Sequence, residues 1–455
     1  MTKKILYLFL TFVTFLLISL ILFGGILKYS NNGGKKFMTI QKVANFIADI
    51  PDILRPSNIK KYFVEGEELL AESERHYGKV KFQRFQKTKT RDELLIIARY
   101  DGDLKRSIVE IVDLNNFNVI HSYKPNIDSL NSNIDTSREE FSNHLVEFSE
   151  KRHQMLHPLL IENGELVFNA GAFYKIDFCG NLIWFNDEDG FHHSIEKDGE
   201  GNFWTSTYMY PYGLDKKLVG DEHGKFDDDA ITKVSESGKI IYSKSVSEIM
   251  LDNGLFGQVF GRYRSFLDDP IHVNDVEPVL SDGPYWKKGD LLISSNILSA
   301  IIHYRPKSNK IINYIVGPFS QQHDVDIISE KEISMFNNNS YNTINKKEVL
   351  TYSEIVIYDF ETNKFSKKFE ESMIENKFIS KSQGVSDFLI DGSLMVEEQN
   401  HGRILFFDAS GNLEWEYVNK ANNGNVYLLS WSRIINDQKV IKNFKDKVKN
   451  TKCKK

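Results

Sequence analysis

A short hairpin unit recurs six times between residues 79 and 437, and it constrains the fold more than any other feature of the sequence. Each unit has an apolar strand, a tight turn and a second strand. The six stretches read IVEIVDLNNFNVI, YKIDFCGNLIW, ITKVSESGKIIY, IIHYRPKSNKIINYI, IVIYDFETNKF and ILFFDASGNLEWEY. Gly or Asn near the end of the turn supplies the left-handed backbone that tight hairpins need. Another apolar run precedes each hairpin, so the repeats predict an all-β fold, a six-bladed β-propeller.

An apolar run without charge covers residues 5–27 near the N-terminus. As a helix it would be roughly 34 Å long, which is enough to cross a bilayer. It is longer than a usual signal-peptide core, and no A-x-A-like cleavage site comes after it. We therefore expect a cytoplasmic stub at residues 1–4 and a retained transmembrane signal anchor at 5–27. A cleaved signal peptide is the alternative.

The remaining chain divides into a linker, the propeller and a tail. Residues 28–78 are expected to form a membrane-proximal linker with a short helix, whose apolar face carries Ile40, Val43, Ala44 and Ile47. The propeller covers residues 79–437, and a basic tail covers 438–455. Because anchors of this kind usually export the domain on their C-terminal side, we expect an inner-membrane, single-pass protein whose propeller faces the periplasm. The net charge of −6 argues against a nucleic-acid partner.

The chain has two cysteines, Cys179 and Cys453. Two cysteines cannot form a metal cluster or a disulfide framework. A single bridge to the tail is the remaining possibility, and we do not expect it to form.

Polar residues recur at the entrances to the first strands of several units. A common frame places a carboxylate three positions after His or Gly, in the pairs His193 and Glu196, His272 and Asp275, His323 and Asp326, and Gly384 and Asp387. Loops that enter the innermost strands of a propeller lie at one mouth of its central channel. Equivalent positions therefore converge around the axis, and three histidines are expected to share one space.

Each of these residues also has a structural interpretation. A histidine beside a strand commonly hydrogen-bonds a neighbouring loop. The repetition of histidine at three equivalent positions favours a functional role over this structural one. The carboxylate either accepts backbone N–H bonds in the turn or holds its histidine in one tautomer. For His323, the orienting group would be Asp324 or Asp326.

Five stretches of the sequence resemble the bacterial arylsulfotransferase family. They read HHSIEKDGEGNFW, HVNDVEPV, GDLLISSNILSAI, QQHDVDIISEKEISMFNNN and SQGVSDFLIDGSLMVEEQNHGRILFFD, and the resemblance runs from about Leu156 to Trp431. It implies an exported six-bladed propeller that moves a sulfuryl group from a phenolic sulfate ester to another phenol. It implies no cofactor and no nucleotide donor, and the chain has no Gly-rich phosphate loop.

The resemblance also implies roles for individual residues. His323, in the QHD-like motif, would be the nucleophile, and its neutral imidazole would form a sulfohistidine. His272 and His193 would bind the sulfuryl oxygens or assist proton transfer. We assign substrate binding to His192, Asn274, Asn296, Gln322 and Arg403.

One position departs from the family pattern. The family places an arginine after the SS of LLISS, where this chain has Asn296. Asn offers amide donors but no charge, and losing a charge-assisted clamp costs a few kcal/mol of transition-state stabilisation, on the order of 3. Arg403, Arg262 and Arg264 are candidates to replace it.

Two other kinds of function remain open. One is a non-catalytic, membrane-anchored propeller that binds an anion or a partner at the channel mouth. The other is a metal site, because three imidazoles such as His193, His272 and His323 are a legitimate zinc set. The separate blades would supply the ligands without the close spacing of a metal motif, so we predict no metal.

Overall fold

The computed structural model describes residues 7, 11–16, 18–19, 23, 68–86, 91–138, 141, 148–220, 224–262, 266–343 and 346–453. The chain divides into two units, Met1–Glu67 and Glu68–Lys455, and the fold described below belongs to the second. Most of the predicted anchor at 5–27, and all of the predicted short helix around residues 40–47, lie outside the described residues. Among the residues that are described, no helix has the length and apolar character needed to span a membrane.

The apolar runs form antiparallel sheets whose strands mostly pair in sequence order, as in the blades of a propeller. A six-stranded sheet contains β5 (Leu156–Leu160), β6 (Leu166–Ile176), β7 (Leu182–Lys197), β8 (Phe203–Tyr208), β9 (Asp229–Val234) and β10 (Ile240–Ser245). The next sheet contains β11 (Val273–Pro278), β12 (Leu291–Ser295), β13 (Ala300–Arg305) and β14 (Lys310–Val316). A third contains β15 (Val325–Ile327), β16 (Glu332–Asn337), β19 (Glu354–Asp359) and β20 (Lys364–Lys368). A separate hairpin, β17 (Ser340–Asn342) and β18 (Lys347–Val349), is inserted between β16 and β19.

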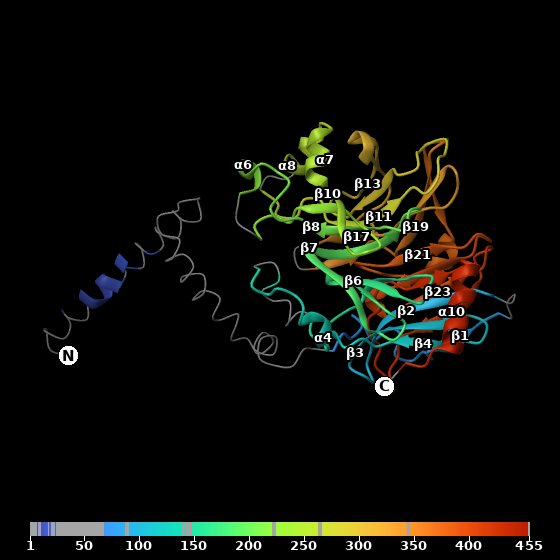
Figure 1. Cartoon of the computed structure of the whole chain (residues 1–455). Helices are drawn as coiled ribbons and strands as arrows, with labels where there is room; N and C mark the ends of the chain where they lie inside the picture. The colour runs from blue at the N-terminus through green and yellow to red at the C-terminus, as the bar shows by residue number, and fades with distance from the viewer. Residues whose placement is uncertain are drawn as a thin grey trace. The chain divides into compact units, whose positions relative to one another are not determined.

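Two further sheets join segments from both ends of the described unit. One contains β21 (Val385–Phe388), β22 (Leu394–Glu398), β23 (Arg403–Phe407) and β24 (Leu413–Val418), with β1 (Phe82–Arg84) added outside β24. In the other, the C-terminal strand β25 (Arg433–Ile435) pairs with β2 (Leu94–Asp101), which is joined by β3 (Arg106–Asp113) and β4 (Asn118–Tyr123). Blue N-terminal strands therefore lie beside red C-terminal segments in Figure 1. The architecture is all-β and propeller-like, and the count of six blades stays a prediction.

Short helices connect the strands. They are α4 (Ile127–Asn131), α6 (Lys216–Val219), α7 (Val246–Asp252), α8 (Phe256–Phe260), α9 (Glu370–Glu375), α10 (Gln438–Asn450) and the 3-10 turns η3 (Pro306–Ser308) and η4 (Gln399–His401). Asp437 caps α10 by accepting hydrogen bonds from the N–H groups of Lys439 and Val440. The predicted basic tail is thus an ordered helix over most of its length.

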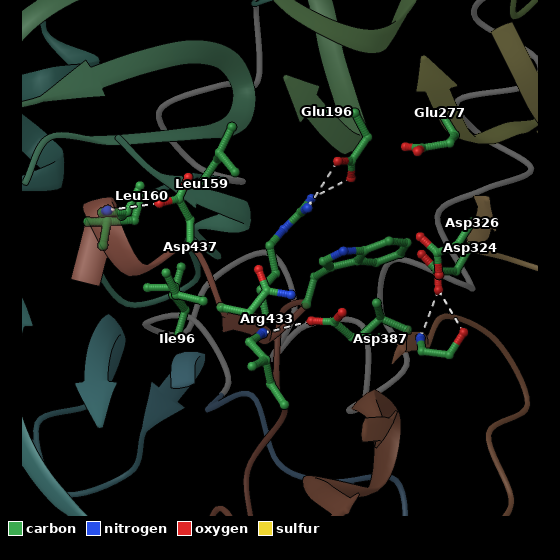
Figure 2. A pocket seen from close by; sticks show the side chains of 17 residues that line it. Ile96, Leu159, Leu160, Glu196, Glu277, Asp324, Asp326, Asp387, Arg433 and Asp437 are labelled. Atoms are coloured by element: carbon green, nitrogen blue, oxygen red, sulfur yellow. Dashed lines mark hydrogen bonds and ion pairs between the residues drawn. The ribbon is translucent and has the colours of Figure 1, made fainter. Parts of the chain in front are cut away.

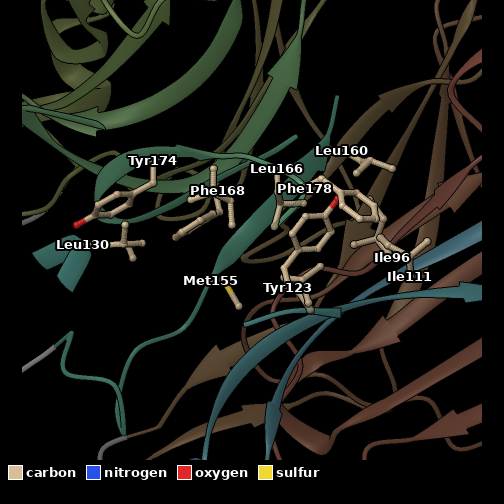
Figure 3. Packing of buried hydrophobic residues seen from close by; sticks show 14 of the residues in the cluster. Ile96, Ile111, Tyr123, Leu130, Met155, Leu160, Leu166, Phe168, Tyr174 and Phe178 are labelled. Atoms are coloured by element: carbon tan, nitrogen blue, oxygen red, sulfur yellow. The ribbon is translucent and has the colours of Figure 1, made fainter. Parts of the chain in front are cut away.

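A large apolar cluster packs the sheet that contains β2 against the sheet that contains β6. Figure 3 shows side chains of both sheets in this cluster, among them Ile96 and Ile111 of one sheet and Leu166 and Phe168 of the other. The helix α10 closes it with Phe444, which is fully buried. Burying such a side chain contributes about 1.5–3 kcal/mol, so the tail is held on the blades by the hydrophobic effect.

A disulfide joins Cys179 to Cys453, with a Cα–Cα distance of 5.3 Å across 274 residues of sequence. The expectation that no such bridge forms was wrong. The ring of Phe444 on α10 packs 5.8 Å from the ring of Phe178, beside Cys179. This packing brings the end of the tail back to the β6–β7 turn, a long-range contact that cysteine spacing cannot reveal.

Candidate functional site

Six residues other than glycine adopt a left-handed backbone at or just before an inner strand segment. They are His157 (φ 49°), His193 (55°), His272 (50°), Gln321 (52°), Gln383 (63°) and Trp431 (74°), which belong to or precede β5, β7, β11, β15, β21 and β25. This conformation costs on the order of 1–3 kcal/mol per residue and persists only where the surroundings enforce it. The repeat is therefore present in the backbone, but its fourth member is Gln321, and His323 lies two positions further along the chain.

Of the carboxylates three positions after these entrances, Asp275 and Asp387 bind the next inner strand and Glu196 binds β25, and none of the three bonds a histidine within the described residues. Asp275 accepts a hydrogen bond from the Val325 N–H at 2.9 Å, and Asp387 accepts one from the Ile434 N–H at 2.8 Å. Glu196 pairs with Arg433 at 2.8 Å. Of the two interpretations open for these carboxylates, the structure supports backbone and interstrand bonding. These bonds tie neighbouring blades together around the axis.

The structure brings the three predicted histidines together. The ring centroid of His193 lies 5.2 Å from that of His272 and 6.3 Å from that of His323. A further histidine, His157, lies 6.1 Å from His193 and stacks at 3.9 Å on Trp431. His193 and His272 are half-buried, whereas His323 is buried. Four imidazoles thus meet where the inner strands begin.

Both ring nitrogens of His323 have partners. Its Nδ1 lies 2.7 Å from Oδ1 of Asn338, and its Nε2 accepts a hydrogen bond of 3.1 Å from the Gln383 backbone N–H. The two contacts define one neutral tautomer, with the proton on Nδ1. Burial lowers the pKa of His323 to about 3, against the opposing hydrogen bond to Asn338. The ring is neutral at physiological pH.

His272 has the opposite protonation preference. Burial lowers its pKa, but the hydrogen bond and the charge of Asp269 outweigh burial, so that the pKa is raised overall. Its Nδ1 lies 2.6 Å from Oδ2 of Asp269. A second carboxylate, Asp229, accepts hydrogen bonds from the backbone N–H groups of His272 and Val273 at 3.0 and 3.1 Å. The loop is therefore fixed on both sides of the ring.

His192 connects His193 to the same carboxylate. The two Nδ1 atoms of His192 and His193 are 2.7 Å apart, and Nε2 of His192 lies 3.4 Å from Oδ1 of Asp229. A proton on His192 Nε2 would face Asp229 and leave His192 Nδ1 to accept from His193 Nδ1–H. Burial, together with the neighbouring histidines as a smaller cause, lowers the pKa of His193 well below its ordinary value. His193 is then a neutral ring.

The amides assigned to substrate binding brace the loops. Asn274 donates to the Gln322 carbonyl at 3.0 Å, and Asn296 donates to the Gln321 carbonyl at 3.1 Å. The Gln322 side chain is fully buried and donates to the carbonyl oxygens of Ser295 and Ala300 at 2.9 and 3.1 Å. These side chains therefore position the loop that carries His323.

The arginine candidates for the missing clamp lie elsewhere. Arg403 is buried and donates to Glu398 at 2.6 Å and to the Asn376 carbonyl at 3.0 Å. Arg262 is exposed and donates to the Leu298 carbonyl at 3.0 Å. Arg264 lies outside the described residues. Within the described part of the chain, neither Arg403 nor Arg262 hydrogen-bonds a histidine of the cluster.

Sequence reasoning missed four residues of the site, which are His157, Asp269, Asn338 and Lys347. The DDP stretch before HVN and the NNN stretch after the strand EISMF were the signals for Asp269 and Asn338. Lys347 lies on β18, and its charge lowers the pKa of both His272 and His323. The inserted hairpin thus brings a cation near the histidines.

A cavity of about 320 Å³ lies further along the inner strands (Figure 2). Its wall carries Glu196, Glu277, Asp324, Asp326 and Asp387 around Arg433. Burial, then repulsion between neighbouring carboxylates, raises the pKa of Glu277, Asp324 and Asp326 well above the ordinary values. The confined space therefore favours the neutral form of these carboxyls more than solvent does.

The described residues do not contain a group of three or more His, Cys, Asp or Glu side chains arranged to hold a metal ion. The two hydrogen bonds of His323 also leave its ring without a free ligand atom. The geometry therefore gives no support to a zinc site at this cluster.

A family model described as "Arylsulfotransferase (ASST)" matches residues 157–420. The match covers more than half of the chain, and the protein belongs to the arylsulfotransferase family. No curated protein matched the chain in the comparison.

Solved structures resemble the chain only at a distance. A protein of unknown function from Bacteroides caccae is 10% identical, with a TM-score of 0.46, over 76% of this chain and 99% of that one. TolB from Acinetobacter baumannii is 8% identical, with a TM-score of 0.42, over 75% of this chain and 66% of that one. These likenesses carry no functional argument.

Proposed function

We propose that the histidine cluster transfers a sulfuryl group from a phenolic sulfate ester to a phenolic acceptor through a sulfohistidine. The observation that carries this proposal is the opposed protonation of two rings, His272 and His323, that both pack near His193. His323 is held neutral, whereas Asp269 favours the protonated form of His272. Titratable groups whose environments push their pKa values apart are the pattern of an acid and a base, or nucleophile, acting together.

In the first step, the lone pair on Nε2 of His323 attacks the sulfur of the ester. The N–S bond forms as the S–O bond to the aryl group breaks, and the leaving oxygen keeps the electron pair. Protonated His272 gives that oxygen its proton. Asn338 holds the Nδ1–H side of His323, which directs Nε2 toward the reaction. In the second step, His272 takes the proton of the acceptor phenol, and the phenol oxygen attacks the sulfur of the sulfohistidine. The new O–S bond forms as the N–S bond breaks, and Nε2 of His323 regains its lone pair.

The contact of Gln383 places a condition on this mechanism. Its backbone N–H occupies the Nε2 lone pair of His323 at 3.1 Å, and that hydrogen bond has to open before attack. His193 is the second candidate for the nucleophile, because its Nε2 makes no hydrogen bond within the described part of the chain. The assignment to His323 rests on the family resemblance.

The test uses the full-length protein in detergent with 4-nitrophenyl sulfate and no acceptor. We expect mass spectrometry of proteolytic peptides to find one sulfated histidine, at His323. A sulfated His193 in place of a sulfated His323 would support the proposed function and identify His193 as the nucleophile. Absence of both sulfohistidine and 4-nitrophenol release would overturn the proposal.

A non-catalytic anion-binding function is the second candidate. Two observations favour it. Nε2 of His323 already accepts a hydrogen bond from the Gln383 N–H, and Asn296 carries no charge and donates its amide N–H to the Gln321 carbonyl. In that case inorganic sulfate would bind, as measured by calorimetry, while no donor would give a sulfated protein. This combination separates binding from transfer.

We also propose that the propeller has six blades. Six left-handed entrance residues support the count, since each begins one inner segment. The first part of β7, up to Asn186, pairs with β6, and its last part, from Gly190 onward, pairs with β8, so the six-stranded sheet counts as two blades. An experimental structure with another number of radial sheets would contradict this.

The propeller is further proposed to lie outside the cytoplasm, behind a retained anchor at residues 5–27. The disulfide between Cys179 and Cys453 supports an oxidising compartment. Protease added to spheroplasts should digest the propeller and leave a short membrane fragment. Protection of the whole chain would reverse this topology.

A further inference from the structure

The missing positive charge is the weakest point of the site. A sulfuryl group carries negative oxygens, and charge-assisted donors are the strongest means of holding them. Asn296 cannot act as that donor, because its side chain is 4% exposed and its amide holds the Gln321 carbonyl. A cation has to reach the histidines from another element.

The hairpin β17–β18 lies against the loops of the histidine site. Asn338, which bonds His323, stands just before it and also donates to the Gln383 carbonyl at 2.8 Å. Ser340 on β17 donates to the Lys381 carbonyl at 2.7 Å and accepts, through its own carbonyl, a 2.6 Å bond from Ser320. The hairpin is therefore fixed to the segments on both sides of His323.

Two adjacent lysines on this hairpin have different environments. Lys346 is 67% exposed and pairs with Glu348. Lys347 is half-buried, is paired in register with Asn342, and makes no ion pair or side-chain hydrogen bond within the described part of the chain. Its charge acts on the rings of both His272 and His323, and burial lowers its own pKa against the opposing charge of Glu72.

We propose that Lys347 binds the sulfuryl oxygens and supplies the charge that the family places at the position of Asn296. This inference rests on the proposed function. The ammonium group is a compact charge with three donors on a flexible stem, so it can track the sulfuryl group from ester to imidazole. A half-buried ammonium without an ion pair in the described residues, on a hairpin fixed against the His323 loop, has the features that an anion needs. The inserted hairpin thus becomes part of the active site.

The test compares Lys347→Met with Lys347→Arg and with the matched control Lys346→Met. The loss of one charged donor to the transition state should lower kcat/KM for 4-nitrophenyl sulfate by about 10²–10³ in Lys347→Met. Lys347→Arg should recover part of this loss, and Lys346→Met should match the wild type. Because the lysine charge lowers the pKa of His272, NMR titration should show that pKa rising in Lys347→Met alone.

The outcomes separate this inference from the proposed function. If the wild type transfers sulfuryl groups and Lys347→Met does so equally well, the role of Lys347 is refuted and the function stands. If the wild type transfers none, the function fails, and calorimetry with inorganic sulfate tests Lys347 alone. A tenfold or greater loss of sulfate affinity in Lys347→Met supports the anion site, and an unchanged affinity refutes it.

Discussion

The substitution Asp269→Asn tests whether His272 works as the acid of the site. Asp269 faces His272 at 2.6 Å between Oδ2 and Nδ1. Asn keeps the size of the side chain and an oxygen that can accept the Nδ1–H bond, and it removes only the charge. The change therefore isolates the electrostatic part of the contact.

The magnitude can be worked from this geometry. A hydrogen bond to a charged group contributes about 1.5–3 kcal/mol, and one pKa unit corresponds to about 1.4 kcal/mol. The side chains of His272 and Asp269 are 28% and 25% exposed, so solvent screens part of the interaction. We therefore take the lower end of the range, and expect Asp269→Asn to remove about 1.5 kcal/mol of stabilisation from the protonated His272 ring and so to lower its pKa.

The assay is the pH dependence of kcat/KM with 4-nitrophenyl sulfate, together with NMR titration of the His272 ring. A general acid must be protonated, so the rate falls as the pH rises through its pKa. In Asp269→Asn this fall should move toward acid pH, as should the NMR midpoint. Asp268→Asn is the control, because Asp268 is exposed and its carboxylate bonds the Asp269 N–H instead of the ring.

An unchanged alkaline limb together with a shifted NMR midpoint would show that His272 is not the acid. An NMR midpoint that does not move would refute the electrostatic argument itself. A similar shift in Asp268→Asn would mean that general surface charge controls the ring. The pH profile and the titration thus test the chemical role and its structural cause separately.

Three further predictions concern stability and positioning. Burial raises the pKa of Asp387 to about 6, so its contribution to stability is complete below about pH 3.8 and is lost as the pH rises through about 6. Between pH 5 and pH 8, urea unfolding should therefore show the wild type losing about 1–2 kcal/mol relative to Asp387→Asn; parallel pH curves would contradict this. Cys453→Ser removes the bridge to Cys179 and should cost about 2–5 kcal/mol in urea unfolding without reductant, and a smaller change would show that packing alone holds the tail. Asn338→Ala removes the side chain that holds Nδ1 of His323 and should slow sulfohistidine formation in a protein that remains folded at the assay temperature. An unchanged rate in the folded variant would show that Asn338 does not position His323.

Several predicted ligands also act as braces of the entrance loops, and their contact with substrate stays a prediction. Asn274, Asn296 and Gln322 were selected because polar side chains stand at strand entrances. In the structure they satisfy carbonyl oxygens of the Gln321–Gln322 turn and of β12 and β13, where a left-handed residue interrupts the regular ladder. Buried backbone groups need such partners. A polar side chain at a strand entrance can therefore be explained by the backbone groups of its loop.

The sequence by itself determined the local features of this protein. The two-residue alternation of apolar side chains and the Gly or Asn turns specify the hairpins, because strand periodicity and left-handed turns are properties of neighbouring residues. Their repetition predicted that His193, His272 and His323 meet, since equivalent positions in a closed ring face one axis. The resemblance of the QQHD stretch to the family motif then suggested sulfuryl transfer as the reaction of these rings.

Only the tertiary structure decided the contacts that cross the ring. Which backbone N–H meets His323, which carboxylate faces His192 and which strand Asp275 binds depend on segments far apart in sequence, and no local pattern encodes them. The same holds for Cys179 and Cys453, which α10 brings together, and for Lys347, whose neighbour Lys346 looks equivalent in sequence. Alternation along a strand sends such adjacent side chains to opposite faces, and the packing of the hairpin decides which face meets the site.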